Sequence, residues 1–356
     1  MTPATAPAAE FVHVVGAGLI GASVGLGLSA AGWDVTIADA DGDAAALAWS
    51  LGAGRELRKG ERPTIVVVAV PPAHCADEVV AQLRAWPDAV VTDVSSVKGT
   101  IADAVHASGG GDRYVGSHPM AGREVSGGLN AQGDLFQARP WVLCPNGARD
   151  NAVDAIRRLA DALGGDVVVM DADRHDRVVA RVSHAPQMAA SAVAAALGSL
   201  DSGDVSLAGQ GLRDVTRIAA SEPGMWAQIA ALNSEALRDT LDHVIEDLSR
   251  VRDAADIGAA AGELVDRGAA GARRIPGKHG GKTREWAGVT VVVPDIAVEL
   301  LRLLGDVAAA DVNVEDLVIE HSPRQPVGLT TLYVDPAVAA SLAAHLEQLE
   351  WQVPQS

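Results

Sequence analysis

One histidine of this chain stands in a segment suited to proton transfer. His118 lies in the run from Gly116 to Gly122, a glycine-flanked stretch that follows a strand-like run of residues. An imidazole exchanges a proton near neutral pH, and a positioned base of this kind contributes about 10²–10⁴-fold to a rate. The same histidine could instead hold the loop by hydrogen bonds, so the segment alone leaves both roles open.

A second segment, from Asp93 to Gly99, carries two serines directly after another apolar run. Parallel sheets bind their ligands at the carboxyl edge of the strands. We therefore expect the hydroxyl groups of Ser95 and Ser96 at the same edge as His118.

Three glycines have the spacing of a dinucleotide-binding loop. Gly16, Gly18 and Gly21 follow the first apolar run and open a helical pattern. Such glycines allow a tight turn, let a pyrophosphate approach the backbone at a helix N-terminus and pack that helix on its strand. A carboxylate about 20 residues later, here Asp39, binds ribose hydroxyls and repels a 2′-phosphate, which predicts NAD rather than NADP. Glycines that serve only a tight turn are the alternative. The residues expected at the cofactor are Gly16, Gly18, Leu19, Ile20, Gly21, Asp39, Val70, Pro71 and Ser95.

Polar residues interrupt two helical stretches further along the chain. Ser183 and Gln187 stand in the first stretch, and Asp214 and Arg217 stand in the second. A buried arginine held by an aspartate forms a bidentate clamp for a carboxylate. A structural ion pair at a helix start explains Asp214 and Arg217 without any ligand.

The elements that must position these residues follow from the apolar patterns. Runs rich in Val and Ile alternate with helical patterns, which is typical of a parallel sheet covered by helices on both faces. We expect strands at 11–15, 34–38, 64–70 and 89–92, a helix at 19–31, and further strands at 113–116, 141–144 and 166–170. This order predicts an α/β Rossmann-type dinucleotide-binding domain over 11–173, after a disordered N-terminus, 1–10.

Helical patterns fill 174–266, which predicts an all-α substrate and dimerisation domain. The stretch 178–197 is apolar on most faces, as in a helix buried in a core or a subunit interface, and 225–250 is a second long amphipathic stretch. Residues 267–284 are basic and glycine-rich, a linker or loop that is either solvated or closes over an anionic ligand. The order of patterns in 285–356 is βαββαβ, the ferredoxin-like plan.

Composition disfavours several classes of function. The 356 residues include 46 acidic and 28 basic side chains, and the net charge of −18 repels nucleic acid and anionic membranes. No apolar run approaches the roughly 20 residues of a membrane span, and no signal peptide is expected. Two cysteines, Cys75 and Cys144, make no disulfide framework, and no histidine spacing is typical of a metal site. A cytoplasmic protein is therefore expected.

Taken together, the motifs resemble those of the prephenate dehydrogenase family, including its arogenate-using members. The motifs are GAGLIG at 16–21, DVSSVKG at 93–99, SHPMAG at 117–122, SHAPQ at 183–187 and RDVTR at 213–217. The resemblance implies NAD-dependent oxidative decarboxylation of a small-molecule substrate in tyrosine synthesis. It implies that His118 accepts the proton of the ring hydroxyl, that Ser96 orients His118, that Arg217 binds a substrate carboxylate and that Ser183 lines the pocket. The tail resembles an ACT domain, which implies an amino-acid effector, and the helical region implies a homodimer.

Two positions depart from the family pattern and leave the substrate open. Gln187 stands where many members have a second histidine, and Arg123 stands where some have threonine. We expect both residues, with Asp214, at the substrate site, and we favour prephenate over arogenate. Two-domain hydroxyacid dehydrogenases are a competing interpretation, but they usually carry a helical lysine that 178–197 lacks. A non-catalytic sensor of NAD and an amino acid is a competing interpretation of another class.

Overall fold

The computed structural model describes residues 10–122, 127–275, 286–321 and 326–354. The chain divides into two compact units, Met1–Glu246 and Asp247–Ser356. Each unit has its own sheet and its own apolar core, and each is described by itself.

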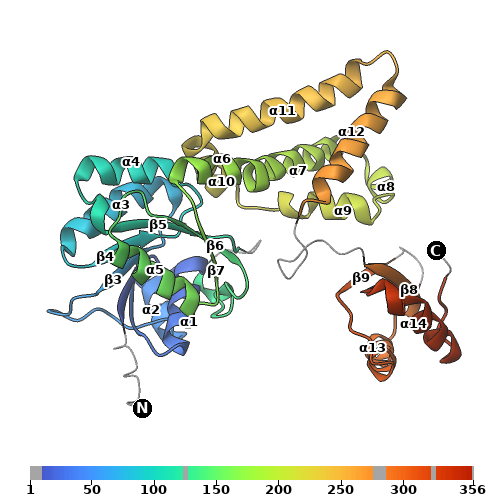
Figure 1. Ribbon diagram of the computed structural model, residues 1–356, viewed down its shortest axis with the longest axis horizontal. Helices are drawn as coiled ribbons and strands as arrows, with labels where there is room; N and C mark the ends of the chain where they lie inside the picture. The colour runs from blue at the N-terminus through green and yellow to red at the C-terminus, as the bar shows by residue number, and fades with distance from the viewer. Residues whose placement is uncertain (1–9, 123–126, 276–285, 322–325, 355–356) are drawn as a thin grey trace. The chain divides into compact units, whose positions relative to one another are not determined.

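The first unit is built on a seven-stranded sheet (Figure 1). Its order is β2-β1-β3-β4-β5-β6-β7. The strands are β1 (Phe11–Val15), β2 (Asp34–Ala38), β3 (Ile65–Val68), β4 (Val90–Asp93), β5 (Tyr114–Pro119), β6 (Pro140–Cys144) and β7 (Asp166–Val169). The helices that connect them are α1 (Leu19–Ala30), α2 (Gly42–Ser50), α3 (Pro72–Ala85), α4 (Gly99–Ser108) and α5 (Asp150–Ala162). The predicted Rossmann-type sheet is confirmed, including the three further strands.

Along the central strands, apolar side chains point alternately to the two faces of the sheet, which explains why helices cover both faces. In β3, Ile65 and Val67 join the core cluster under α1 and α5, whereas Val66 and Val68 join the cluster under α3 and α4. All four side chains are buried, so the strand buries apolar surface on both faces as central parallel strands do.

The last two strands of the sheet, β6 and β7, are parallel to each other and run against the other five, so the expectation of a parallel sheet is wrong at this point. β6 pairs antiparallel with β5, and His118 lies opposite Val142 in that register. The described part of the connection between them holds only a short 3₁₀ turn, Gly128–Asn130. Without a crossover helix, the chain returns beside β5 in the opposite direction. The connection passes the first glycine loop, because the backbone N–H of Gln132 donates to Ser23 on α1.

After β7 the chain is helical to the end of the first unit, and this helical region continues into the start of the second unit. The helices are α6 (Ala172–Val179), α7 (Ala185–Ala196), α8 (Ser202–Val205), α9 (Gln210–Thr216), α10 (Pro223–Leu232), α11 (Ser234–Asp253) and α12 (Ile257–Ala272). The single helix expected at 178–197 is instead α6 and α7 joined by a π-helical turn, Ala180–His184. Pro186 offers no N–H and its ring crowds the preceding turn, which a wider turn relieves. The stretch expected at 225–250 is likewise divided, because Asn233 separates α10 from α11.

The last part of the second unit is a small antiparallel sheet with two helices. Its elements are β8 (Ala287–Pro294), α13 (Glu299–Ala309), β9 (Asp316–His321), β10 (Val327–Val334) and α14 (Pro336–Gln348), and the strand order is β8-β10-β9. β10 buries every second residue against the helices, as a sheet with one wet face requires. The short strand expected at 351–353 is only a bridge from Gln352 to Val292.

Part of the predicted basic linker has a different structure. Residues 267–272 belong to α12, whereas 276–284 lie outside the described residues. Within the described ranges, no helix combines the length and the apolar character needed to cross a membrane.

Candidate active site

In the glycine loop after β1, two of the three glycines are packed too closely for a side chain, and the third is exposed. Gly16 has φ +106°, and a Cβ there would lie 2.3 Å from the carbonyl oxygen of Ala69. A Cβ on Gly21 would lie 1.9 Å from the carbonyl oxygen of Gly16. Gly18 begins α1, is exposed, and has no atom within 4 Å of a Cβ position. Packing thus explains the first and third glycines, while the second leaves the helix N-terminus, with Leu19 and Ile20 in its first turn, open to an anionic group.

Asp39 follows β2 and reaches this loop. Its Oδ2 accepts the backbone N–H of Ala17 at 2.6 Å, and its Oδ1 accepts that of Asp41 at 2.9 Å. The carboxylate therefore lies beside the open helix terminus, where a dinucleotide ribose would need it. Val70 and Pro71 lie after β3, and Pro71 caps α3. The loop and the carboxylate together fit a dinucleotide.

The segment after β4 is fixed by a buried ion pair that the motif analysis missed. Asp93 and Lys98 have no exposed side-chain surface, and the Lys98 ammonium donates to Asp93 Oδ1. The same carboxylate accepts the N–H of Ser95 at 2.8 Å and the hydroxyl of Tyr114 at 2.7 Å. These donors compensate a buried charge that would otherwise be costly. The feature of the sequence that could have predicted this ion pair is a single lysine within an otherwise apolar and serine-rich turn.

The serines of this segment are both near the sheet edge, as predicted. The Ser95 side-chain oxygen is buried and makes no hydrogen bond with the described residues. A buried hydroxyl without a partner is rare and is suited to a ligand contact. Ser96 is half-buried in the same turn.

His118, near the end of β5, is joined to two further buried residues. Its Nδ1 lies 2.9 Å from Nε2 of His175, and Nδ1 of His175 lies 2.8 Å from Oδ1 of Asp176. His175 and Asp176 lie on α6 and were not predicted. The feature of the sequence that could have pointed to them is a histidine directly followed by an aspartate at the start of the helical region. The ring partner of His118 in the structure is thus His175, whereas Ser96 was expected to orient it.

Burial sets the protonation of this group. It lowers the pKa of His118 well below the usual range, and the nearby His175, Lys98 and His184 lower it further. Burial alone would raise the pKa of Asp176, but hydrogen bonds from His175, Gly99 and Lys98 outweigh it and lower that pKa. At neutral pH the arrangement is a neutral imidazole, ready to accept a proton, next to an ionised carboxylate.

The π-helical turn carries the next predicted residue. Ser183 is half-buried in it. His184, the next residue, is 1% exposed, and its Nδ1 lies 3.2 Å from Nδ2 of Asn233. Burial lowers the pKa of His184 to about 4, with His175 adding to the shift and Asp176 opposing it. Asn233 also donates to the backbone oxygen of Asp176, so the turn is tied to α6.

Gln187 and Arg217 lie on neighbouring segments. The Gln187 amide donates to the backbone oxygen of Ile218 at 2.9 Å, which ties α7 to the turn that Arg217 begins. Arg217 and Asp214 are exposed in the single chain, and the Asp214 carboxylate accepts from Gln210 at 2.8 Å. The expected burial of Arg217 is therefore wrong for the single chain. Arg123 lies outside the described residues.

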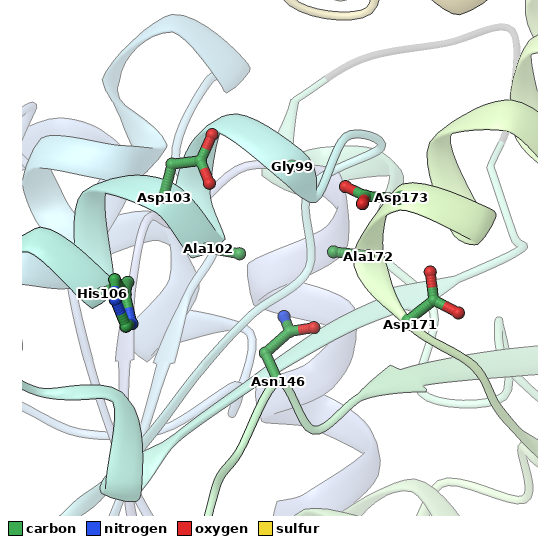
Figure 2. Close-up of a pocket in the computed structure, with 8 residues that line it drawn as sticks. All are labelled: Gly99, Ala102, Asp103, His106, Asn146, Asp171, Ala172 and Asp173. Carbon is green, nitrogen blue, oxygen red and sulfur yellow. The ribbon is translucent and has the colours of Figure 1, made fainter.

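A separate pocket of about 230 Å³ lies between α4 and the start of α6 (Figure 2). Asp103, Asp171 and Asp173 line it, together with His106 and Asn146. Three carboxylates repel phosphate, so this pocket does not suit the nucleotide.

The comparisons with known proteins match both halves of this site. Residues 24–169 match the family described as prephenate dehydrogenase, nucleotide-binding domain, and residues 171–265 match prephenate dehydrogenase, dimerization domain. The probable prephenate dehydrogenase NovF of Streptomyces niveus is 33% identical over 353 residues, which cover 95% of this chain and 98% of that protein. This chain belongs to the prephenate dehydrogenase family. It is an oxidoreductase with a nucleotide-binding domain followed by a dimerisation domain.

Two solved structures extend the comparison. Prephenate dehydrogenase from A. aeolicus, in complex with hydroxyphenyl propionate and NAD+, is 27% identical with a TM-score of 0.67, over 75% of this chain and 98% of that one. Arogenate dehydrogenase from Synechocystis is 25% identical with a TM-score of 0.62, over 74% of this chain and 99% of that one. The two solved structures therefore cover about three quarters of this chain, whereas the similarity to the Streptomyces niveus protein covers 95% of it.

Proposed function

We propose that this family member catalyses the NAD-dependent oxidative decarboxylation of prephenate to 4-hydroxyphenylpyruvate, a step of tyrosine synthesis. The observation that carries the proposal is His118, a buried imidazole with one nitrogen already bonded and a pKa held low by burial. Oxidation of an alcohol needs a group that accepts the hydroxyl proton, and a neutral histidine at the ligand edge of the sheet is suited to that role.

The cofactor would bind along the glycine loop. Gly16, Gly18 and Gly21 with Leu19 and Ile20 would hold the pyrophosphate, and Asp39 would bind the ribose. Val70, Pro71 and Ser95 would lie toward the nicotinamide, and the buried hydroxyl of Ser95 offers it a hydrogen bond. When bound, NAD supplies the acceptor for the hydride that leaves the ring carbon.

The chain's own residues would handle the proton and the charge. His118 accepts the hydrogen bond of the ring hydroxyl and then its proton, as that oxygen becomes a carbonyl. The ring carboxylate leaves as CO2, and its electron pair completes the aromatic ring. The phenolate oxygen so formed takes the proton back from His118, which gives the hydroxyl of the product. Arg217 binds a substrate carboxylate, and Ser96, Ser183, Gln187, Asp214 and Arg123 complete the substrate side.

Arogenate is the second candidate substrate, because an arogenate dehydrogenase is among the similar structures. Prephenate carries a pyruvyl side chain where arogenate carries an ammonium and a carboxylate. Gln187 is neutral and can donate to a carboxylate or a hydroxyl, so it suits either substrate.

The test is NADH formation by the purified chain with NAD and either prephenate or arogenate, with CO2 release measured in parallel. We expect coupled NADH and CO2, faster with prephenate. Preference for arogenate would make the chain an arogenate dehydrogenase. Silence with both substrates while NAD still binds would favour the sensor.

We also propose that the three domains span 11–173, 174–266 and 285–356. The chain would form a homodimer through the helical domain, and it would act in the cytoplasm. Large apolar side chains exposed in the helical region support the homodimer, among them Leu207 at 84%, in the turn after α8, and Ile245 at 58%, on α11. Both cysteines are free and buried, which suits a reducing compartment.

For the tail we propose a ferredoxin-like, ACT-type regulatory module that binds an amino acid. The antiparallel order β8-β10-β9 with the Gln352 bridge beside β8 supports it, because a ferredoxin-like sheet has its last strand at that edge. Inhibition by tyrosine that disappears when 285–356 are deleted would support the proposal. Equal inhibition with and without the tail would place the effector at the active site.

A further inference from the structure

We propose that His175 and Asp176 are positioning residues that fix the ring tautomer of His118, so that its Nε2 is the nitrogen that accepts the proton. The inference rests on the proposed function for its catalytic consequence, but its structural part stands on hydrogen bonding alone. Neither residue touches the expected substrate.

The carboxylate of Asp176 determines which atom donates in each of the two hydrogen bonds that link His118, His175 and Asp176. An ionised carboxylate only accepts, so Nδ1 of His175 must carry the hydrogen that lies between it and Asp176. A neutral His175 then has a lone pair on Nε2, which can only accept from Nδ1 of His118. His118 is thereby left with its hydrogen on Nδ1 and a free lone pair on Nε2. The reverse tautomer of His118 would place two lone pairs against each other.

Asp176 is held too firmly to turn away from this role. Its Oδ1 also accepts the backbone N–H of Lys98 at 2.9 Å, and its Oδ2 accepts that of Gly99 at 2.8 Å. Both donors belong to the turn that the buried Asp93–Lys98 pair fixes. The carboxylate therefore has one orientation, and the tautomer of both histidines follows from it.

The same arrangement stabilises His118 after it has accepted the proton. The O–H bond of the substrate breaks, an N–H bond forms at Nε2, and the buried imidazole becomes positively charged. Lys98, whose charge Asp93 offsets in part, still disfavours the imidazolium, so the charge of Asp176 is what favours it in this arrangement. His184, the remaining titratable neighbour, has a pKa of about 4 and stays neutral.

A carboxylate-to-amide change tests the tautomer directly. In Asp176→Asn, the NH2 group lies either at the Oδ1 position, where it opposes the Lys98 N–H and donates to Nδ1 of His175, or at the Oδ2 position, where it opposes the Gly99 N–H. The first arrangement reverses both histidines and moves the hydrogen of His118 to Nε2. Long-range ¹H–¹⁵N correlation spectra of the full chain labelled at histidine report the tautomer, and the signal lost in His118→Asn assigns His118. We expect only the Nδ1–H form in the wild type, and the Nε2–H form to appear beside it in Asp176→Asn.

Kinetics measured on the same variants give the catalytic consequence. Reversing the tautomer of a catalytic histidine costs on the order of 10⁴ in kcat. We expect kcat of Asp176→Asn to fall at least 10²-fold, while KM and the Kd of NAD change less than about threefold. Asp173→Asn removes an exposed charge from the same helix and should leave kcat unchanged. His175→Gln can still accept from His118 and donate to Asp176, so it should retain about tenfold more activity than His175→Phe.

The outcomes separate the two proposals. An Nε2–H form of His118 in the wild type overturns the proposed tautomer, and an Nε2–H form in Asp176→Asn with wild-type kcat overturns its catalytic consequence. If Asp176→Asn does not fold, equal losses in His175→Gln and His175→Phe overturn it. A wild type that turns over neither prephenate nor arogenate would contradict the proposed function, while the spectra would still decide the tautomer.

Discussion

The two sides of the proposed site, one proposed to accept the proton and one proposed to bind the substrate carboxylate, are built in opposite ways. His118, His175 and Asp176 are buried, and every contact between them comes from strands and helices of one compact unit. Arg217 and Asp214 lie on short helical segments, α9 and the turn after it, and are exposed in the single chain. The buried side has one geometry before any ligand binds, whereas the exposed side offers charge without a fixed enclosure. Substitutions on the two sides should therefore affect different kinetic constants.

The largest effect is expected at His118. His118→Asn removes the proton acceptor but keeps a side chain of similar polarity, so kcat should fall at least a hundredfold while the Kd of NAD stays the same. Turnover with both substrates and NAD binding by titration measure the two quantities. Undiminished turnover would contradict the role of the base.

Arg217 should instead affect substrate affinity. Arg217→Ala removes a charged hydrogen bond of about 1.5–3 kcal/mol, which raises KM roughly 10–100-fold with a smaller change in kcat. Arg213→Ala, an exposed arginine on the same helix segment, is the matched control. Equal increases in KM for both variants would mean that only the local positive charge matters.

A smaller effect concerns stability on the buried side. The pKa of His184 is about 4 in the folded chain against 6.5 when unfolded, so the unfolded state takes up a proton first as pH falls. The linkage makes the folded state lose stability from pH 6.5 down to about 4, and His184 accounts for about 2 kcal/mol between pH 7.5 and pH 5. Urea unfolding at both pH values should show this loss in the wild type and a correspondingly smaller one in His184→Gln. An identical loss in both proteins would assign the acid sensitivity to other groups.

The pH profile sharpens the comparison without any substitution. His118 must be neutral to accept a proton, and burial lowers its pKa, so kcat/KM should stay constant down to a pH below 6.5 and fall only there. Asp176→Asn should move this fall to still lower pH, because the carboxylate favours the protonated ring. A fall centred above 6.5 would mean that the attraction of the protonated ring to Asp176 outweighs the effect of burial.

The sequence predicted the local parts of the molecule better than the parts assembled from distant segments. The glycine loop with Asp39, the strand ranges and the edge position of Ser95 and His118 all follow from short-range patterns, and the structure agrees. The His118–His175 contact joins residues 57 positions apart, and no periodicity encodes such a pair. The Asp93–Lys98 ion pair was missed because lysine usually marks the surface. The π-helical turn was missed because a single proline gives no sign of which wider turn will relieve it.

The reversal of β6 has a consequence for how this enzyme could diversify. Because β5 and β6 run in opposite directions, the connection from 120 to 139 starts and ends at the sheet edge that carries His118. Gln132 and Phe136 tie parts of this connection to α1 and β6, so exchanges at its exposed positions, such as Leu129, are the ones that leave the strands and the buried histidines unchanged. Selection or directed evolution can therefore vary the surface beside the edge where we propose that the substrate binds, while His118 and the nucleotide loop are inherited intact.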